Sequence, residues 1–240
     1  MALYSYIDAC YNRLLAGSAS SPLPIVPDFP RQVVEAISNR LGLLFIAEKV
    51  AGGNLCLANA EEVRPEYRTT FSPGDLLDYY YGLLHLPRYR LHYQEFSKKG
   101  FSSLPYPKDV ELFWLLAQLG RRLRQLHLLE RPEKEHHLHP FPISGSNRVL
   151  VQRFVVEGKE GVGGSEEEPS ATGRIFINDH QYFSNVAASV WAFGLGVYPP
   201  AQRWLEDRIG HKLGLEDVLH YQRILAVLAA TDRLVREFNG

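Results

Sequence analysis

Three histidines and two glutamates lie close together in the sequence and are the residues best suited to ligate a metal ion. They are Glu133, Glu135, His136, His137 and His139. Neutral imidazoles and carboxylates suit zinc or nickel, and a metal-dependent hydrolase is the function that such a site would imply. The spacing is tight, however, and no distant fourth ligand is apparent, so a polar loop is the preferred interpretation. We therefore expect no bound metal and no cofactor.

Motifs of nucleotide hydrolysis, ester hydrolysis and base methylation are absent from the sequence. It has no Gly-rich phosphate loop followed by lysine, no Gly-x-Ser-x-Gly turn, and no Asn-Pro-Pro or Asp-Pro-Pro tetrapeptide ending in an aromatic residue. The segment 161–164 is rich in glycine, but glutamates follow it, which disfavours an anion site. We expect that the chain is not an enzyme by itself, and we assign no catalytic residue.

The first half of the chain has the apolar spacing of helices. Helices are expected at 2–15, 30–41, 72–86 and 109–129, with another opening within 89–96. Ser72 and Pro73 supply a cap and a first-turn proline for one of them. Arg121, Arg122 and Arg124 lie off the apolar stripe of the 109–129 helix, and we expect them on a solvated face.

The second half of the chain contains two short segments, 149–156 and 173–177, that are rich in apolar and β-branched residues. We expect them to pair as strands. The Gly- and Glu-rich stretch 157–172 between them should be exposed and poorly ordered. Helical spacing returns at 201–208 and 215–238. The predicted fold class is therefore α+β, with two helical parts flanking a small β-sheet.

The expected organisation has three parts. Residues 1–30 form an N-terminal helix and a linker that is rich in serine and proline. Residues 31–131 form a helical part, and residues 132–240 form a small sheet plus C-terminal helices of the same domain. A length of 240 residues is sufficient for a hydrophobic core without a disulfide or a metal.

Composition places the protein in a broad class but does not suggest a ligand. The net charge is −1, whereas binding to phosphates needs basic surface; residues 74–131 hold nine Lys or Arg against six acidic residues. Cys10 and Cys56 are outside any Cys-x-x-Cys spacing, which favours reduced thiols. No apolar run approaches the roughly 20 residues of a membrane span. We expect a soluble cytoplasmic protein with no membrane partner.

Several motifs of the second half occur together and in a fixed order. They are Arg-Ile-Phe-Ile-Asn at 174–178, Gln-Tyr-Phe at 181–183, Gly-Val-Tyr at 196–198, Trp-Leu-Glu-Asp-Arg at 204–208 and His-Tyr-Gln-Arg-Ile at 220–224. Upstream, the sequence Tyr-Tyr-Tyr-Gly-Leu-Leu-His-Leu-Pro-Arg-Tyr-Arg occupies 79–90. This combination resembles the C-terminal specificity, or target-recognition, domain of type ISP restriction–modification enzymes and related adenine-specific DNA methylases. The resemblance covers roughly residues 28–240.

The sequence departs from the family pattern at two places that could touch DNA. Val197 stands where the family has the second glycine of a Gly-Gly-Tyr, and His211 stands where a basic residue follows glycine. The nuclease, helicase and methyltransferase regions that precede this domain in the family are missing from the sequence. We expect either an excised domain or a separately encoded specificity subunit.

The resemblance implies a module that reads bases in double-stranded DNA held against a methyltransferase. Direct readout uses Arg for guanine and Asn or Gln for adenine, and phosphates are bound by Arg, Lys and hydroxyl groups. The candidate DNA-binding residues are Asn147, Arg148, Tyr198, Gln202, Arg203, Arg208, His211, Lys212, Tyr221, Gln222 and Arg223. Arg203 and Asp207 lie four residues apart on a predicted helix and could instead pair with each other.

The function predicted from the resemblance is target recognition that positions a partner adenine methyltransferase or nuclease on its DNA site. The partners would be double-stranded DNA and a methyltransferase/helicase partner or parent chain. The alternative is a helical docking or structural protein derived from such a domain that no longer reads DNA. Because the net charge is −1, we expect binding by the isolated chain to be weak, sensitive to salt and nearly blind to sequence.

Overall fold

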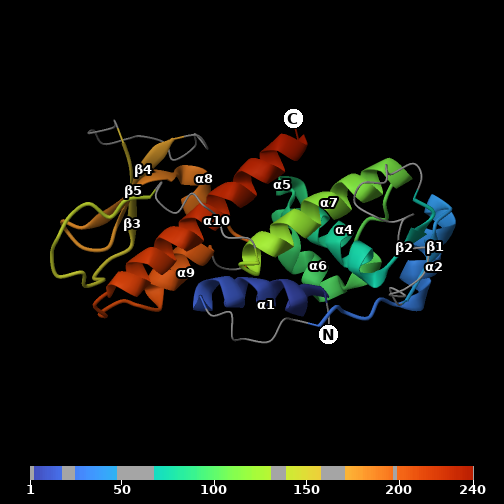
Figure 1. The fold of residues 1–240 in the computed structure, drawn as a ribbon, viewed down its shortest axis with the longest axis horizontal. Helices are drawn as coiled ribbons and strands as arrows, with labels where there is room; N and C mark the ends of the chain where they lie inside the picture. Colours follow the sequence, from blue (N-terminus) through green and yellow to red (C-terminus); the bar gives the residue numbers. More distant parts are fainter. Residues whose placement is uncertain are drawn as a thin grey trace. The chain divides into compact units, whose positions relative to one another are not determined.

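The protein is described by a computed structural model, which gives the placement of residues 3–17, 25–47, 68–130, 139–157, 171–196 and 199–239. The chain divides into two compact units. Unit 1 comprises 1–10 and 21–125, and unit 2 comprises 11–20 and 126–240. Figure 1 shows the elements of both units. No helix within the described ranges combines the length and apolar character needed to cross a bilayer.

Unit 1 is mainly helical, as the spacing of apolar residues predicts. Its elements are α1 (Leu3–Ala16, shared with unit 2), α2 (Arg31–Leu41), β1 (Leu44–Phe45), β2 (Thr70–Phe71), α4 (Pro73–His85), α5 (Pro87–Arg90), α6 (Tyr93–Lys99), the short 3-10 helix η2 (Phe101–Ser103) and α7 (Val110–His127, shared with unit 2). Strand β1 pairs with β2 in parallel. The predicted cap of α4 is confirmed, because Ser72 Oγ accepts from the Asp75 amide and Asp75 Oδ2 accepts from the Ser72 amide.

Helices α4 and α7 approach each other so closely that glycine is required at the crossing. A Cβ added to Gly120 would lie 1.8 Å from the carbonyl oxygen of Asp78, and one added to Gly82 would lie 2.4 Å from that of Leu116. Backbone atoms cannot retreat from such an overlap without separating the helices. The glycine of the 79–90 motif is therefore a packing requirement of unit 1.

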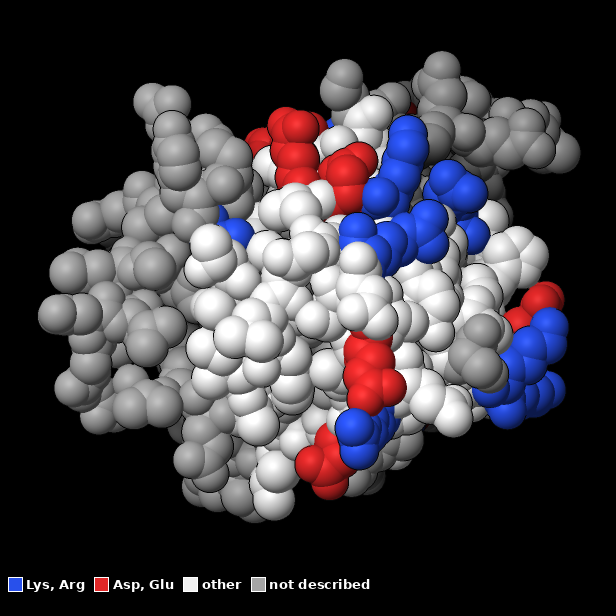
Figure 2. Space-filling model, turned by 90° about the vertical axis from the view of Figure 1, so that its right-hand side faces the viewer, with Lys and Arg blue, Asp and Glu red and all other residues white. Residues whose placement is uncertain are grey.

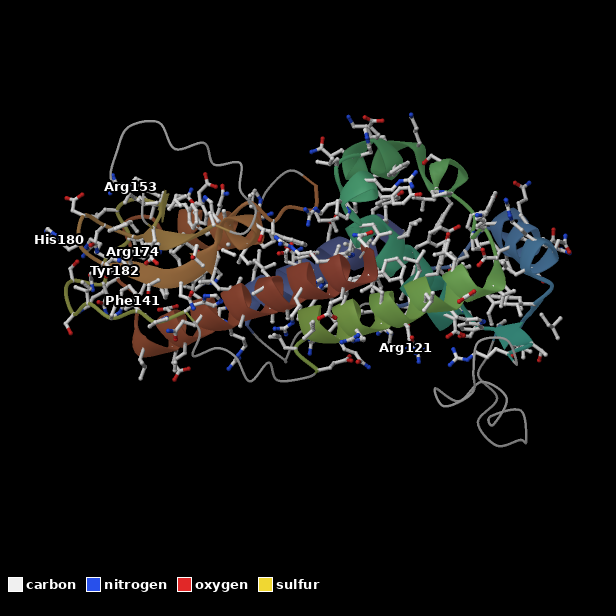
Figure 3. All side chains as sticks on the ribbon, turned by 90° about the horizontal axis from the view of Figure 1, so that it is seen from above. Arg121, Phe141, Arg153, Arg174, His180 and Tyr182 are labelled. Carbon is white, nitrogen blue, oxygen red and sulfur yellow. The ribbon has the colours of Figure 1, made fainter. Side chains whose placement is uncertain are left out.

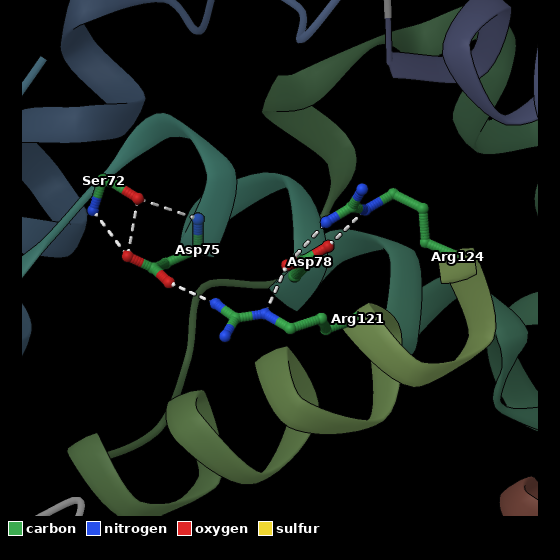
Figure 4. Close-up of polar contacts among 5 residues, drawn as sticks. All are labelled: Ser72, Asp75, Asp78, Arg121 and Arg124. Carbon is green, nitrogen blue, oxygen red and sulfur yellow. Dashed lines mark hydrogen bonds and ion pairs between the residues drawn. The ribbon is translucent and has the colours of Figure 1, made fainter. Parts of the chain in front are cut away.

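A buried ion-pair cluster joins the same two helices (Figure 4). Asp78, only 1% exposed, accepts from Arg124 Nε at 2.7 Å and from Arg121 Nε at 3.2 Å. Arg121 also donates to Asp75 at 3.0 Å, which links the cluster to the cap at Ser72. The expectation of a solvated face is thus wrong for Arg121 and Arg124, because both side chains neutralise carboxylates on α4.

One face of unit 1 combines uncharged and charged side chains. Figure 2 views unit 1 from the side of α2, β1 and β2, and shows groups of acidic and basic residues among uncharged ones. A groove of about 530 Å³ opens in this part of unit 1. Its lining is partly apolar, with Phe29, Val34 and Phe45, and partly charged, with Asp28, Arg31 and Glu35. We place no phosphate contact on this face.

Unit 2 contains a three-stranded antiparallel sheet followed by helices. Its elements are β3 (Arg153–Val156), β4 (Thr172–Phe176), β5 (Tyr182–Ala187), α8 (Ala188–Trp191), α9 (Pro200–Glu206) and α10 (Leu215–Asn239). The predicted pairing of 149–156 with 173–177 is confirmed, and the α+β fold class with it. Strand β5 was not predicted from the sequence. Residues 158–170 lie outside the described residues, so the expected exposure and disorder of 157–172 stay a prediction.

The packing of α10 explains why the C-terminal motifs are so apolar. Its buried residues include Tyr221, Ile224, Leu225 and Leu228. Tyr221 contacts Phe183 of β5 with ring centroids 4.7 Å apart. Burial of a large apolar side chain contributes roughly 1.5–3 kcal/mol, so these contacts hold the sheet of unit 2 against its longest helix.

Replacing Gly120 by alanine should destabilise unit 1 strongly. The new methyl group overlaps the carbonyl oxygen of Asp78, and overpacking of this kind costs roughly 3 kcal/mol of unfolding free energy. Urea unfolding followed by circular dichroism measures the loss. The matched control is Gly74→Ala, because the nearest atom to a Cβ at Gly74 is a side-chain oxygen 3.6 Å away. Equal stability of the two variants would contradict the close helix crossing.

Neutralising Asp78 should also be costly, since Arg121 and Arg124 would lose their shared carboxylate. Asp78→Asn is expected to lower the unfolding free energy by about 3–5 kcal/mol, the usual effect of breaking a buried pair. The control is Glu35→Gln, which removes the exposed Arg31–Glu35 pair and should change stability by less than about 1 kcal/mol. Similar losses in both variants would show that the Asp78 cluster is solvated.

The stability of unit 1 should fall as the solution becomes acidic. His85 is fully buried and its Nδ1 donates to the Tyr81 carbonyl at 2.6 Å; burial lowers its pKa from 6.5 to about 4. The unfolded chain therefore takes up a proton below pH 6.5 that the folded chain binds only near pH 4. Unfolding free energy should drop by roughly 2 kcal/mol from this group between pH 7.5 and 5.

Urea unfolding across that pH range tests the assignment of His85. The variant His85→Gln should show a shallower dependence of stability on pH than the wild type, whereas His180→Gln, at an exposed histidine, should keep the wild-type slope. An unchanged slope in His85→Gln would refute the assignment.

Candidate nucleic-acid interface

The turn between β4 and β5 carries a buried polar cluster centred on Gln181. Its Oε1 accepts from the Asn147 amide at 2.7 Å and from Asn178 Nδ2 at 3.0 Å. Its Nε2 donates to Asn147 Oδ1 at 2.7 Å and to the Ile143 carbonyl at 2.9 Å. Gly145 leaves the space, because a Cβ there would lie 2.8 Å from Gln181 Cδ. The segment before β3 is thereby fixed to the turn.

Backbone hydrogen bonds then connect this segment to the loop between α9 and α10. The Gly210 amide donates to the Val149 carbonyl, and the Val149 amide donates to the His211 carbonyl, at 2.7 and 2.9 Å. Arg148 and Lys212 form an antiparallel bridge. On its other side the segment is bonded to the residue that follows β4, since the Leu150 amide donates to the Ile177 carbonyl. The loop 210–213 is thus held in a fixed register beside the sheet.

Three of the predicted residues come together at this bridge, namely Arg148, His211 and Lys212, and we call them the basic trio. All three are exposed. Arg148 Nη1 donates to the Gly210 carbonyl at 2.5 Å, and the trio forms no ion pair with an acidic residue in the described part of the chain. The positive charges of Arg148 and Lys212 are therefore available to a ligand, and the backbone that carries them is hydrogen-bonded on both sides.

Arg208 is already engaged by the protein. Its guanidinium lies 3.6 Å from the ring centroid of Trp204, donates to the Trp204 carbonyl at 3.1 Å and lies 3.9 Å from Asp217 Oδ1. Burial lowers its pKa, with Asp217 and Asp207 acting in the opposite direction. This side chain holds α9 against the start of α10, and we leave it out of the proposed contact surface.

Four more of the predicted residues also bond to the protein itself. Tyr221 is fully buried, and its hydroxyl donates to the Ala201 carbonyl at 3.1 Å. Gln202 donates to the Trp191 carbonyl and Gln222 to the His139 carbonyl, at 3.0 and 2.8 Å. Asn147 belongs to the Gln181 cluster described above. These side chains position backbone segments of unit 2. The residue type alone, polar or aromatic, could not distinguish this structural role from contact with DNA.

Arg203 on α9 and Arg223 on α10 are exposed. The side chain of Arg203 makes no ion pair with Asp207 or with any other residue that the structure places, so the alternative pairing within the helix is wrong. Tyr198 lies outside the described residues. The structure therefore brings together only the basic trio, with Arg203 and Arg223 on neighbouring elements of unit 2.

The histidine group considered for a metal falls largely outside the described residues, which exclude 131–138. His139 is described and buried; its Nδ1 donates to the Asn185 carbonyl at 2.9 Å, and burial lowers its pKa. No group of three or more His, Cys, Asp or Glu residues within the described ranges could hold an ion. The expectation of no metal at 136–139 stays a prediction.

Gln181, which organises this site, was not among the residues predicted from the sequence. Its partners Asn147 and Ile143 lie 34 and 38 residues away in sequence, so no local spacing could reveal the contacts. The only available signal was its place in the Gln-Tyr-Phe motif after Asn178.

Comparison with known proteins gave a family and two related structures. The Type ISP C-terminal specificity domain family matches residues 31–237. One similar structure is the ATP-dependent Type ISP restriction-modification enzyme LlaBIII bound to DNA, with 17% identity and a TM-score of 0.42 over 70% of this chain and 11% of that chain. Another is a nuclease-deletion mutant of the Type ISP enzyme LlaGI in complex with a DNA substrate mimic, with 18% identity and a TM-score of 0.41 over 69% of this chain and 16% of that chain.

No curated protein matches the chain. The chain corresponds to only 11% and 16% of the length of the two enzymes, whereas the family match includes the described parts of α2 through α10. The chain therefore belongs to the family of Type ISP C-terminal specificity domains, the non-catalytic domains that serve DNA target recognition in restriction–modification enzymes.

Proposed function

We propose that this chain recognises the target sequence in double-stranded DNA and positions an adenine methyltransferase and nuclease on that site. Membership of the specificity-domain family carries the proposal. The methyltransferase and helicase would be a parent chain or a separate subunit, acting on DNA in the cytoplasm. The chain itself contributes recognition and no chemistry.

The basic trio is the part of unit 2 best suited to meet the duplex. Arg148 offers a planar fork of donors that fits guanine or a phosphate, and Lys212 offers a compact charge that fits a phosphate. Because their backbones are bridged, the two charges keep a fixed spacing. Arg203 and Arg223, both exposed, would add contacts from α9 and α10.

A second candidate function is a docking protein that has lost DNA contact. The net charge of −1 and the internal engagement of Arg208 and Tyr221 favour it. Under this hypothesis the chain would bind the methyltransferase but would add no affinity for DNA. The two hypotheses are separated by measuring DNA binding with the partner present.

Binding of the isolated chain to duplex DNA is expected to be weak, with Kd of roughly 10⁻⁴ to 10⁻⁶ M, and to weaken further with salt. Addition of the methyltransferase should give tight, sequence-specific binding, because the partner supplies the opposite wall around the duplex. In that complex, the double variant Arg148→Ala/Lys212→Ala should weaken binding by roughly 30-fold or more, because two lost contacts of about 1–3 kcal/mol each sum to at least about 2 kcal/mol. Fluorescence anisotropy at two salt concentrations measures all three effects.

The matched control removes two charges from unit 1, by Lys98→Ala with Arg122→Ala, both of which are exposed. Its affinity should stay near that of the wild type. A wild-type complex that ignores DNA sequence would refute the recognition hypothesis and favour the docking protein. Loss of affinity in the control equal to that of the double variant would refute the placement of the contact surface at the basic trio.

A further inference from the structure

The outer face of the three-stranded sheet carries an ordered row of side chains that includes none of the candidate DNA-binding residues predicted from the sequence. The register places Arg153 of β3 opposite Phe176 of β4, and Phe176 opposite Tyr182 of β5. Directly paired residues project from the same face of a sheet. Arg174 precedes Phe176 by two residues, so it lies on this face as well. Figure 3 labels Arg153, Arg174 and Tyr182 at the sheet.

Each aromatic ring of the row supports one guanidinium. Arg153 Cζ lies 5.3 Å from the centroid of Phe176, and Arg174 Cζ lies 4.8 Å from that of Tyr182. The two rings are themselves 5.1 Å apart. Cation–π contacts of this length are favourable, and they hold both guanidinium groups over the sheet. The result is an Arg–Phe–Tyr–Arg ladder across the three strands.

A bulge in β5 accompanies the ladder. Gly173 pairs with Val186 and Ile175 pairs with Phe183, so two residues of β5 lie opposite Arg174 alone. Asn185, one of the two, has φ of 57°, a conformation that asparagine tolerates better than most residues. Bulges bend a strand and redirect the side chains near it. The bulge thus lies where Arg174 reaches toward Tyr182.

The guanidinium groups of the ladder lie over its rings. Phe176 and Tyr182 are half-buried, and each has one guanidinium over its ring. The Arg153 side chain has no hydrogen bond or ion pair within the described part of the chain. Arg174 forms an ion pair with Glu157, to which its Nε donates at 2.9 Å, so only the terminal nitrogens of Arg174 are left to meet a phosphate. A stacked guanidinium keeps its donors in plane, where they can bind phosphate oxygens.

The inner face of the sheet makes this surface rigid. Ile175, Phe183 and Val186 are fully buried. The ring centroid of Phe183 lies 4.7 Å from that of Phe141 and 4.7 Å from that of Tyr221. Since the strands are anchored from behind, the ladder does not have to be ordered when a ligand binds. Preorganisation of this kind lowers the cost of association.

We infer that the ladder is a second DNA-contact surface that binds the sugar–phosphate backbone of the duplex through Arg153 and Arg174. The inference rests on the proposed function. The ladder lies at the end of the sheet that adjoins the basic trio. Ile177, next to Phe176, accepts backbone hydrogen bonds from the segment that begins at Arg148. Backbone contacts fix the register of a protein on DNA and carry no sequence information. The ladder orients the duplex, and other residues read it.

The test uses the full chain in complex with its methyltransferase. It compares the double variant Arg153→Ala/Arg174→Ala with the wild type. Affinity for cognate and unrelated duplexes should fall by the same factor, about 10-fold or more at low salt, and the slope of log K against log salt should decrease by about 2 for two lost phosphate contacts. The ratio of cognate to unrelated affinity should stay unchanged. The pair Arg153→Lys with Arg174→Lys should keep the wild-type salt slope, because both charges remain.

The control is again Lys98→Ala with Arg122→Ala, which removes the same charge from unit 1 and should keep the wild-type slope. Unchanged affinity and slope in the alanine pair would overturn the inference, and so would equal losses in the alanine and lysine pairs, which would indicate a structural role. Loss of methyltransferase binding with DNA affinity intact would make the ladder a protein-docking face and also overturn it. A wild-type complex that binds no DNA would instead refute the proposed function.

Discussion

The four hydrogen bonds of Gln181 are the interaction on which the candidate interface depends. A buried amide without partners costs roughly 1–3 kcal/mol, and here both ends of the side chain are satisfied by groups near the start of the sheet. Those bonds place Asn147, and the backbone beyond Asn147 pairs with the loop 210–213. The spacing of Arg148 and Lys212 therefore follows from an amide that contacts neither side chain.

In unit 1, buried polar groups fix the crossing of α4 and α7. Gly82 and Gly120 allow two helices to meet at backbone distance, and Asp78 then neutralises two arginines beside the crossing. Such a buried pair specifies one arrangement of α4 and α7, because any other would leave charges without partners. Both units use buried polar groups to select a single geometry around an apolar core.

The distribution of arginine reconciles a DNA-recognition role with a net charge of −1. Arg121 and Arg124 are paired with carboxylates inside unit 1, and Arg208 is packed on Trp204. By contrast, Arg148 and Arg153 have no acidic partner among the described residues. Binding to phosphate depends on which charges face the ligand, so the sum over the chain says little about this surface. Under the proposed function, a few positioned donors on the sheet would act together with the surface of a methyltransferase partner.

The sequence by itself determined the α+β class, most helix positions, the cap at Ser72 and the pairing of β3 with β4, because these follow from periodicity and local turn chemistry. Its ordered motifs also predicted the family. Only the tertiary structure decided the role of each polar residue: Tyr221 became core, Arg121 an internal ion pair, and Arg153 part of an exposed ladder. The physical reason is that a helix or strand pattern is set by near neighbours. Whether an arginine is neutralised or offered to a ligand depends on acids and rings that lie tens of residues away, such as Asp78 for Arg121 and Phe176 for Arg153.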